Sequence, residues 1–378
     1  MFVELHLIQN FAPANLNRDD TNNPKDCEFG GVRRARVSSQ CIKRTIRTCP
    51  VFAETTGVDV GTRTRWITRL LREALVDTGK PEVEAGAVAL RFAKAYAKKM
   101  DSKKQDKTSI LVYISPEELQ EAVTTLVENW DTALQTSKES DKLVVNVVKQ
   151  LLTKYEITSA PDIALFGRML AVKPTTKILD AACQVAHAIS THRVTMEMDF
   201  FTAVDDLVQG EETGASMMGF TGFDSACFYR YARIDWGQLV QNLNGDADLA
   251  RRTVEGFLRA AVAAVPSGKQ TSFAANNPPS FLLAVVRKDG MGWSLANAFE
   301  RPVRPSRGSG LVAPSVKALD AYWGRLCQVY GAGTLVRTTA LVLDGDLELE
   351  NLGKERVEDL DAWVSAVTEA LPAKEGNA

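Results

Sequence analysis

The sequence predicts an α+β protein, in which a sheet of separate strands is combined with amphipathic helices. Residues 2–9 show the period-two alternation of a strand, and helical periodicity dominates the block from about Thr62 to Lys154. After this block, strand-like and helical segments follow one another to the C-terminus. This order favours a sheet with helices on one of its sides, interrupted by a helical insertion.

The N-terminal elements lead from a strand to a helix. A loop rich in Asn, Asp and Pro follows the first strand, from Asn10 to Asp26. After Phe29-Gly30-Gly31 comes a basic stretch, and then Ser38 or Ser39 is in position to cap a helix that runs to about Thr48. Pro50 is expected to close this helix.

The central block predicts helices around one short strand. Apolar pairs recur at helical spacing from Trp66 to Leu75, and again over residues 82–99 and 116–135. Residues 108–114 have strand character, and Ser115-Pro116 is a typical helix start. The block therefore reads as an insertion into the sheet domain.

The C-terminal half alternates between the two kinds of element. Strands are predicted over residues 163–169, 226–234 and 281–287, and helices over 178–191, 246–265, 314–329 and 356–371. The segment from Glu197 to Asp224 has little periodicity and carries four glycines. Its composition favours an exposed loop or a long hairpin.

Bulk properties exclude several classes of protein. The 378 residues are 45% hydrophobic and 24% charged, as in ordinary globular proteins. No apolar run is long enough to span a membrane, and the N-terminus lacks the basic start of a signal peptide. The six scattered cysteines fit a reduced, cytoplasmic protein. Since the net charge is −2, any nucleic-acid surface must be a local patch.

Such a patch is predicted between Phe29 and Val51. This window contains six Arg or Lys residues and no acidic residue. If the helix begins at Ser38 or Ser39, its residues separate into an apolar face and a polar, cationic face. The apolar face has Ile42, Ile46 and Cys49, and the other face has Gln40, Lys43, Arg44 and Arg47.

The position of these cations favours an anionic ligand. A helix N-terminus already carries partial positive charge and free N–H groups, so acidic residues usually lie there. Here three arginines precede the cap instead. A bound phosphate chain would relieve this repulsion. The alternative is a basic helix face that is only solvated.

Other candidates are weaker. Asp199-Phe200-Phe201-Thr202 places two aromatics in a polar segment, where they could stack on bases or anchor the segment to the core. Asp19 and Asp20 are compatible with metal-dependent cleavage, although turn formation is the favoured interpretation. His187 and His192 do not share a helix face, and no P-loop occurs. We therefore predict no metal and no cofactor.

Several blocks in order resemble the backbone subunit of the type I-E CRISPR Cascade complex, the CasC family. The most specific is Gly30-Gly31-Val32-Arg33-Arg34-Ala35-Arg36-Val37-Ser38-Ser39-Gln40. It is supported by Leu16-Asn17-Arg18-Asp19-Asp20, Asp162 to Met169, Ala186 to His192, Phe201 to Leu207, Phe228 to Ala232 and Ser294 to Glu300.

The resemblance implies a hand-like fold and a non-catalytic role. We expect an RRM-like (ferredoxin-like) palm, a large helical insertion as fingers and a long hairpin or loop as thumb. The implied boundaries are 1–60, 159–194 and 226–378 for the palm, 61–158 for the fingers and 195–225 for the thumb. Copies of the chain would stack along crRNA with other Cascade subunits, and present the guide for pairing with target DNA in antiviral defence.

The resemblance also assigns residues. The residues expected to bind RNA are Arg18, Lys25, Arg33, Arg34, Arg36, Ser38, Gln40, Lys43, Arg44, Arg47, Arg168, Met169, Phe200, Phe201 and Thr202. By the resemblance, the backbone phosphates would be held by Arg18, Ser38, Gln40, Lys43, Arg44 and Arg47. Arg168 and Met169 would lie near a displaced base, and Phe200, Phe201 and Thr202 would belong to the thumb. Lys138, Lys142 and Lys149 are weaker candidates for target-DNA contact. Two alternatives stay open. One is a metal-dependent RNA endonuclease that uses Asp19, Asp20, Asp205 or Asp206, and the other is a free-standing single-strand RNA chaperone.

Overall fold

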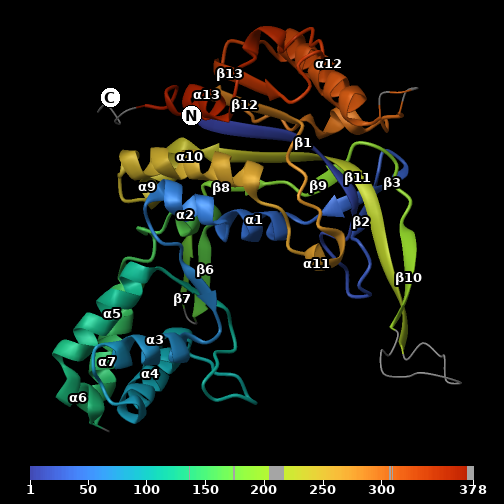
Figure 1. The fold of residues 1–378 in the computed structure, drawn as a ribbon. Coiled ribbons are helices and arrows are strands. Elements are labelled where there is room, and N and C mark those ends of the chain that lie inside the picture. Colours follow the sequence, from blue (N-terminus) through green and yellow to red (C-terminus); the bar gives the residue numbers. More distant parts are fainter. Residues whose placement is uncertain (136, 173–174, 204–216, 306–307, 309, 373–378) are drawn as a thin grey trace, which may run out of the picture. The chain divides into compact units, whose positions relative to one another are not determined.

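The computed structural model describes residues 1–135, 137–172, 175–203, 217–305, 308 and 310–372 (Figure 1). The chain divides into two compact units. The sheet unit comprises Met1–Phe52, Gln184–Ile234 and Val254–Pro372, and the helical unit comprises Ala53–Cys183 and Asp235–Thr253. The helical unit is thus longer than the insertion expected at 61–158. The α+β class is confirmed by a large antiparallel sheet combined with many helices.

Nine strands of the described residues form the large sheet, in the order β13-β12-β1-β11-β9-β3-β2, with β8 and β10 also paired to β11. Their bounds are β1 Phe2–Ala14, β2 Asp26–Phe29, β3 Val32–Val37, β8 Cys183–Val185, β9 Ala188–Ser190, β10 Glu197–Ala203, β11 Met217–Asp235, β12 Phe281–Arg287 and β13 Leu335–Val342. β1 and β12 pair antiparallel with Leu5 opposite Ala284, and β12 continues antiparallel into β13.

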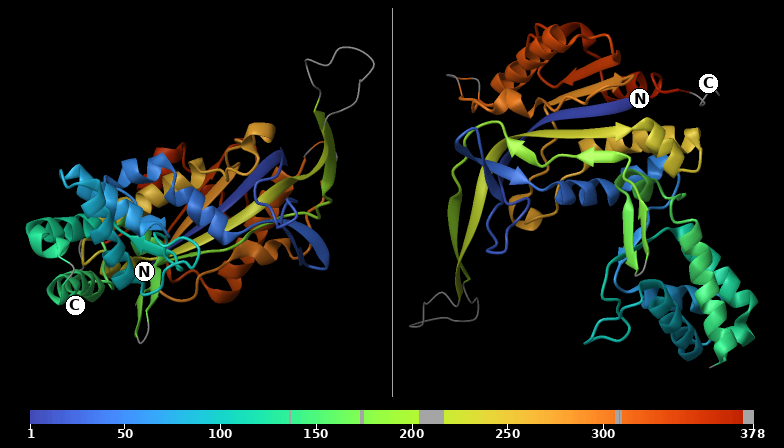
Figure 2. Two further views of the ribbon diagram at one scale, coloured as in Figure 1. Left: turned by 90° about the horizontal axis from the view of Figure 1, so that it is seen from below. Right: turned by 180° about the vertical axis from the view of Figure 1, so that it is seen from behind.

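Strand β1 is buried on both faces. Leu5 and Leu7 line a small internal cavity together with Ile42 and Ile46 of helix α1 (Ser39–Arg47). On the other face, Ile8 joins the core cluster of helix α12 (Val312–Tyr330). Figures 1 and 2 show α1 and α12 on opposite sides of β1. The prediction of helices on one side is therefore wrong.

Two buried polar residues gave β1 the pattern of a strand with one solvent-exposed face. Glu4 and His6 alternate with leucines like the solvent side of a strand, yet both have no exposed surface. Glu4 accepts hydrogen bonds from the backbone N–H of Trp293 at 2.6 Å and from the Tyr231 hydroxyl at 3.0 Å. Burial of Glu4 is tolerated because its carboxylate oxygens have partners, which hydropathy alone does not reveal.

The remaining helices of the sheet unit are short or lie near its C-terminus. They are α11 Gln270–Phe273, the 3-10 helices η1 Leu295–Phe299 and η2 Gly353–Glu355, and α13 Leu360–Thr368. Two helices extend across the division between the units: α2 Pro50–Thr56 and α10 Ala247–Ala263. Helix α1 ends at Arg47, before Pro50, as the sequence predicted, and Pro50 begins the next helix because proline fits the first helical turn.

The helical unit has a core of its own. Its helices are α3 Ile67–Asp77, α4 Glu82–Ala97, α5 Pro116–Glu128, α6 Trp130–Leu134, α7 Lys138–Thr153, α8 Pro161–Phe166 and α9 Trp236–Asn242. Two small antiparallel pairs accompany them, β4 Thr62–Thr64 with β5 Val112–Ile114, and β6 Arg168–Val172 with β7 Thr175–Leu179. Phe92 and Tyr96 stack in the core with ring centroids 5.7 Å apart.

Two segments have the wrong predicted element type. Residues 163–169 were expected as a strand, but most of them belong to α8, which Pro161 starts. Because Ile163 to Leu165 are buried all round, the apolar run has no period that separates helix from strand. Residues 178–191 were expected as a helix, but they contain the end of β7 followed by β8 and β9. Their alanines favour helix locally, and pairing of β8 and β9 with β11 overrides that preference.

The segment predicted as loop or hairpin contains an antiparallel ribbon of β10 and β11. Phe200 pairs with Phe220, and Phe201 pairs with Gly219. Asp205 and Asp206, two suspects of the nuclease alternative, lie outside the described residues. Within the described ranges, no helix is both long and apolar enough to cross a membrane.

Candidate nucleic-acid interface

Helix α1 begins with the predicted serine cap. The Ser38 hydroxyl accepts a hydrogen bond from the backbone N–H of Cys41 at 3.3 Å. Ile42 and Ile46 are buried, while Gln40 and Arg44 are exposed, as the predicted separation of the two faces requires. Cys49, predicted on the apolar face, is half-buried and lies beyond the end of α1 at Arg47. The first turn carries no acidic residue. The partial positive charge of this helix end is therefore available to an external anion.

A groove of about 900 Å³ opens beside α1. We call it the α1 groove, and its lining residues are Leu16, Asn17, Arg18, Asp19, Asn22, Ser38, Gln40, Cys41, Arg44, Thr45, Thr48, Cys49, Pro50, Ala263, Ala264, Val265, Ser267, Gly268 and Asn276. Four predicted RNA-binding residues are among them: Arg18, Ser38, Gln40 and Arg44. Lys25, Lys43 and Arg47 are partly exposed in the same unit but do not line the groove.

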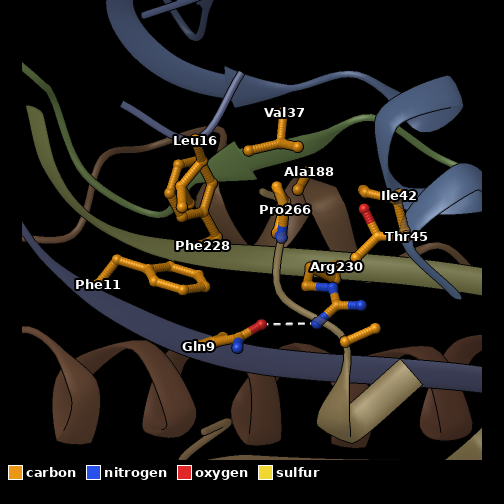
Figure 3. A pocket seen from close by; sticks show the side chains of 11 residues that line it. Gln9, Phe11, Leu16, Val37, Ile42, Thr45, Ala188, Phe228, Arg230 and Pro266 are labelled. Atoms are coloured by element: carbon orange, nitrogen blue, oxygen red, sulfur yellow. Dashed lines mark hydrogen bonds between the residues drawn. The ribbon is translucent and has the colours of Figure 1, made fainter. Parts of the chain in front are cut away.

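The apolar side of α1 is seated on the sheet over a small cavity. Figure 3 shows Ile42 and Thr45 facing Val37 and Phe228 across this space. Beneath them the half-buried Arg230 donates a hydrogen bond to Gln9 at 2.6 Å. This packing fixes the orientation of α1, so its polar face is held toward the α1 groove.

The loop before β2 forms another wall of the α1 groove. Asn17 accepts a hydrogen bond from the backbone N–H of Ser38 at 2.9 Å, which ties this loop to the helix cap. Asp19 accepts from the Thr21 hydroxyl and from the backbone N–H of Asn23. The Thr21 hydroxyl is the largest cause that lowers the pKa of Asp19.

Asp19 therefore acts in a turn, as the favoured interpretation predicts. The part of the chain that the structure describes contains no group of three or more His, Cys, Asp or Glu able to hold a metal ion.

Arg36 is positioned by partners on two segments. Its Nε donates to the backbone carbonyl of Asp26 at 3.1 Å, and its Nη1 lies 3.0 Å from Nδ1 of His187. His187 lies between β8 and β9, not in a helix. Burial, followed by the charges of Arg36 and Lys25, lowers the pKa of His187.

Arg34 has to be removed from the predicted phosphate ligands. Its side chain is fully buried, and its guanidinium donates to four backbone carbonyls, those of Phe29, Ser190, Phe299 and Glu300. Gly30, in the adjacent turn, is so close to Glu300 that a Cβ would lie 1.8 Å from its carbonyl oxygen. Arg34 thus holds the β2–β3 turn against the core.

Arg168 needs the same correction. Its side chain has no exposed surface, forms an ion pair with Glu118 at 2.6 Å and lies over the ring of Tyr155. The next residue, Met169, is 66% exposed, because alternate residues of a strand point to opposite faces. Met169 therefore remains a candidate, within the helical unit, and Arg168 stabilises that unit.

The ribbon carries an exposed apolar face. Phe200 and Phe220 pack with ring centroids 5.2 Å apart, and both are more than half exposed. Phe201 lies on the opposite face, across Gly219, where a Cβ would come within 2.4 Å of its ring. Thr202 is also exposed. The aromatic pair is thus split between two faces, which places Phe200 beside Phe220 and not beside Phe201.

The three lysines expected to contact target DNA lie on α7. Lys138, Lys142 and Lys149 are all exposed. Glu139 and Asp141 lie in the first turn of the same helix and offset part of their charge. Their placement is compatible with a nucleic-acid contact, although it is equally that of a solvated helix face.

Comparison with known proteins assigns the chain to a family. Residues 3–366 match the family model described as CT1975-like protein. The chain belongs to this family.

Two chains of solved structures are similar to the CT1975-like chain over 98% of its length and 100% of theirs. One, described as "CRISPR RNA-guided surveillance complex, pre-nicking", has 33% identity and a TM-score of 0.84. The other, described as "CRISPR RNA-guided surveillance complex", has 27% identity and a TM-score of 0.73. No curated protein matched. These matches support the resemblance to a Cascade-type CRISPR subunit.

Sequence reasoning missed one wall of the α1 groove in this CT1975-like protein. The groove is also lined by residues more than 200 positions from α1 in the chain, namely Ala263, Ala264, Val265, Ser267, Gly268 and Asn276. A Cβ on Gly268 would come within 2.4 Å of the Leu16 carbonyl oxygen, so this wall packs closely on the Arg18 loop. Gly268 is a local sequence signal of close backbone packing, but it does not indicate which segment packs against it.

Proposed function

We propose that this chain is a non-catalytic subunit that binds crRNA and forms the repeated backbone of a type I-E Cascade-like complex. In this proposal the sheet unit is the RRM-like palm, the helical unit the fingers and the β10–β11 ribbon the thumb. Copies of the chain and other Cascade subunits are its protein partners. Target DNA is bound through pairing with the guide. Both similar solved chains come from complexes described as RNA-guided.

The α1 groove is the observation that carries this proposal. It combines the cationic side chains Arg18 and Arg44 with the N-terminal end of a capped helix. Guanidinium groups make forked contacts to phosphate, and helix N-termini favour anions. The α1 groove is open at the surface, so it suits a chain of phosphates better than a single enclosed ligand.

RNA binding in the α1 groove is expected to be independent of base sequence. Phosphate contacts position a nucleic acid without reading it, while pairing between guide and target supplies the sequence information. The exposed rings of Phe200 and Phe220 would add stacking or wedging contacts, which every base can make.

The experiment measures binding of the full chain to single-stranded RNAs of graded length and unrelated sequence, with the salt concentration titrated. We expect the number of bound copies to rise with RNA length, and affinity to be indifferent to sequence. Each phosphate contact should contribute roughly −0.7 to the log–log salt slope. Arg18→Glu with Arg44→Glu should abolish binding.

Arg325→Glu is the matched control, because Arg325 is exposed on α12 and does not line the α1 groove. One copy per RNA regardless of length would contradict the backbone role and favour a free-standing chaperone. Unchanged binding by the Arg18 and Arg44 variant would contradict the α1 groove. Magnesium-dependent RNA cleavage that Asp20→Ala removes would establish the nuclease alternative.

A further inference from the structure

A second cationic cavity lies at the root of the β10–β11 ribbon. Its volume is about 460 Å³, and it is lined by Gly31, Val32, Arg33, Arg193, Val194, Thr195 and Met196. None of these lining residues is acidic. Arg33 was among the predicted RNA-binding residues and Arg193 was not, and no residue that lines this cavity also lines the α1 groove.

Backbone pairing places the two arginines at one cavity. The backbone N–H of Val194 donates to the carbonyl of Arg33 at 3.0 Å, so residues 193–196 run beside the start of β3. Gly31 adopts a φ of +71°, and nothing lies within 4 Å of the position where a Cβ would be. The turn therefore stays open on this side.

The charge at the cavity is positive although one arginine is paired. Arg33 forms an exposed ion pair with Asp26, and exposed pairs are weak and exchange readily. Arg193 is exposed. Burial, followed by repulsion from Asp26, raises the pKa of Asp224 to about 7, so near neutral pH this carboxyl carries only part of its negative charge. Two guanidiniums that face one cavity favour an anion between them.

Strand β3 connects this cavity to the α1 groove. Arg33 stands at its beginning, and its last residue, Val37, directly precedes the cap Ser38. Side chains 33, 35 and 37 share one face of the strand, and on that face Val37 lines the small cavity beneath α1 together with Ile42. Six residues of strand span roughly 20 Å, so one extended polymer could reach both sites.

We propose that Arg33 and Arg193 form a second phosphate-binding site, which holds the same single-stranded RNA after it leaves the α1 groove. Met196, 41% exposed at the cavity edge, offers an apolar surface to the adjacent base. The inference rests on the proposed RNA-binding function and extends the path of the strand toward the ribbon. The ligand is a ribose-phosphate chain, which this site recognises by its charge and not by the identity of its bases.

The test compares wild type, Arg193→Ala, Arg325→Ala and Arg44→Glu on oligouridine RNAs of about four and about sixteen nucleotides, the range of single-strand site sizes. For the long RNA, Arg193→Ala should weaken binding about five- to tenfold, and should reduce the salt slope by roughly 0.7. The short RNA is expected to fill the α1 groove first, so the affinity of Arg193→Ala for this RNA should match that of wild type. Arg193→Lys should retain most of the affinity.

The outcomes separate this inference from the proposed function. If Arg193→Ala equals wild type on the long RNA while Arg44→Glu has lost binding, the second site is refuted and the α1 groove stands. If Arg193→Ala weakens short and long RNA equally, a separate site along the strand is also refuted. If Arg44→Glu still binds, the proposed α1 groove fails instead. Equal melting temperatures of the Arg193→Ala and Arg325→Ala variants confirm that both are folded.

Discussion

His187 accepts a hydrogen bond from Arg36, with 3.0 Å between Nδ1 of the histidine and Nη1 of the arginine. Arginine only donates, so Nδ1 must be unprotonated for this contact to form. The pKa of His187 is lowered by burial and then by the nearby Arg36 and Lys25. The protonation of His187 is therefore expected to respond to a phosphate that enters beside these cations.

We predict that RNA binding is coupled to proton uptake at His187. A bound phosphate would offset the charges of Arg36 and Lys25 and raise the lowered pKa of His187 toward or above its ordinary value. Affinity should therefore increase as the pH falls below about 6.5, and level off above it. Fluorescence anisotropy over this pH range checks the trend. His187→Gln should bind with a flatter pH profile, and an identical profile in both proteins would contradict the coupling.

Loss of the Ser38 cap should weaken both the fold and RNA binding. Ser38→Ala removes the acceptor for the Cys41 N–H, which should lower the free energy of unfolding by about 1 kcal/mol. Ser137 caps α7 in the helical unit and provides the matched control. Ser137→Ala should lower stability by a similar amount and leave RNA affinity unchanged. Equal RNA affinity in both variants would mean that the end of α1 does not contact the ligand.

Two neighbouring arginines should behave differently. Arg34→Met leaves buried carbonyls without donors and should lower the free energy of unfolding by about 3 kcal/mol. Arg33→Met removes an exposed ion pair and should change stability by less than about 1 kcal/mol. Thermal and urea unfolding of the two variants gives the comparison. Similar stabilities would show that the contacts of Arg34 contribute little.

The buried His6 should make the protein sensitive to acid. Burial, followed by the charge of Arg287, lowers the pKa of His6 to about 3, whereas an unfolded chain has the ordinary value of 6.5. Between these values the unfolded state binds a proton that the folded state excludes. Stability is therefore complete above pH 6.5, and is lost on acidification at about 1.4 kcal/mol per pH unit from this residue.

His6→Gln should flatten that dependence. The amide can still contact the Tyr229 hydroxyl, which lies 2.9 Å from Nδ1 of His6, and it does not titrate. His187→Gln, at an exposed position, should keep most of the dependence. Urea unfolding at several pH values between about 4 and 7 measures both. An unchanged slope in His6→Gln would place the acid sensitivity elsewhere.

Local patterns predicted the elements whose signal lies within a few residues. Helix α1, with its cap and buried Ile42 and Ile46, follows from spacing alone, as does β12 over Phe281–Arg287. The helix predicted over residues 178–191 is wrong, because their alanines favour helix locally while the surrounding strands supply partners for backbone hydrogen bonds. Pairing between distant segments is not encoded in a local window.

By itself, the sequence determined the α+β class, the amphipathic α1 helix and a cationic patch free of acidic residues, because each depends on composition or on short-range spacing. The tertiary structure decided which cations face outward. Arg34 and Arg168 are as basic as Arg33 and Arg44, yet long-range packing buries the first two against carbonyls and a carboxylate. The tertiary structure also brings Ser267 and Asn276 to the α1 groove and Arg193 to the same cavity as Arg33. The sequence could not predict these cavities, because each is formed by chain segments that meet only when the sheet has assembled.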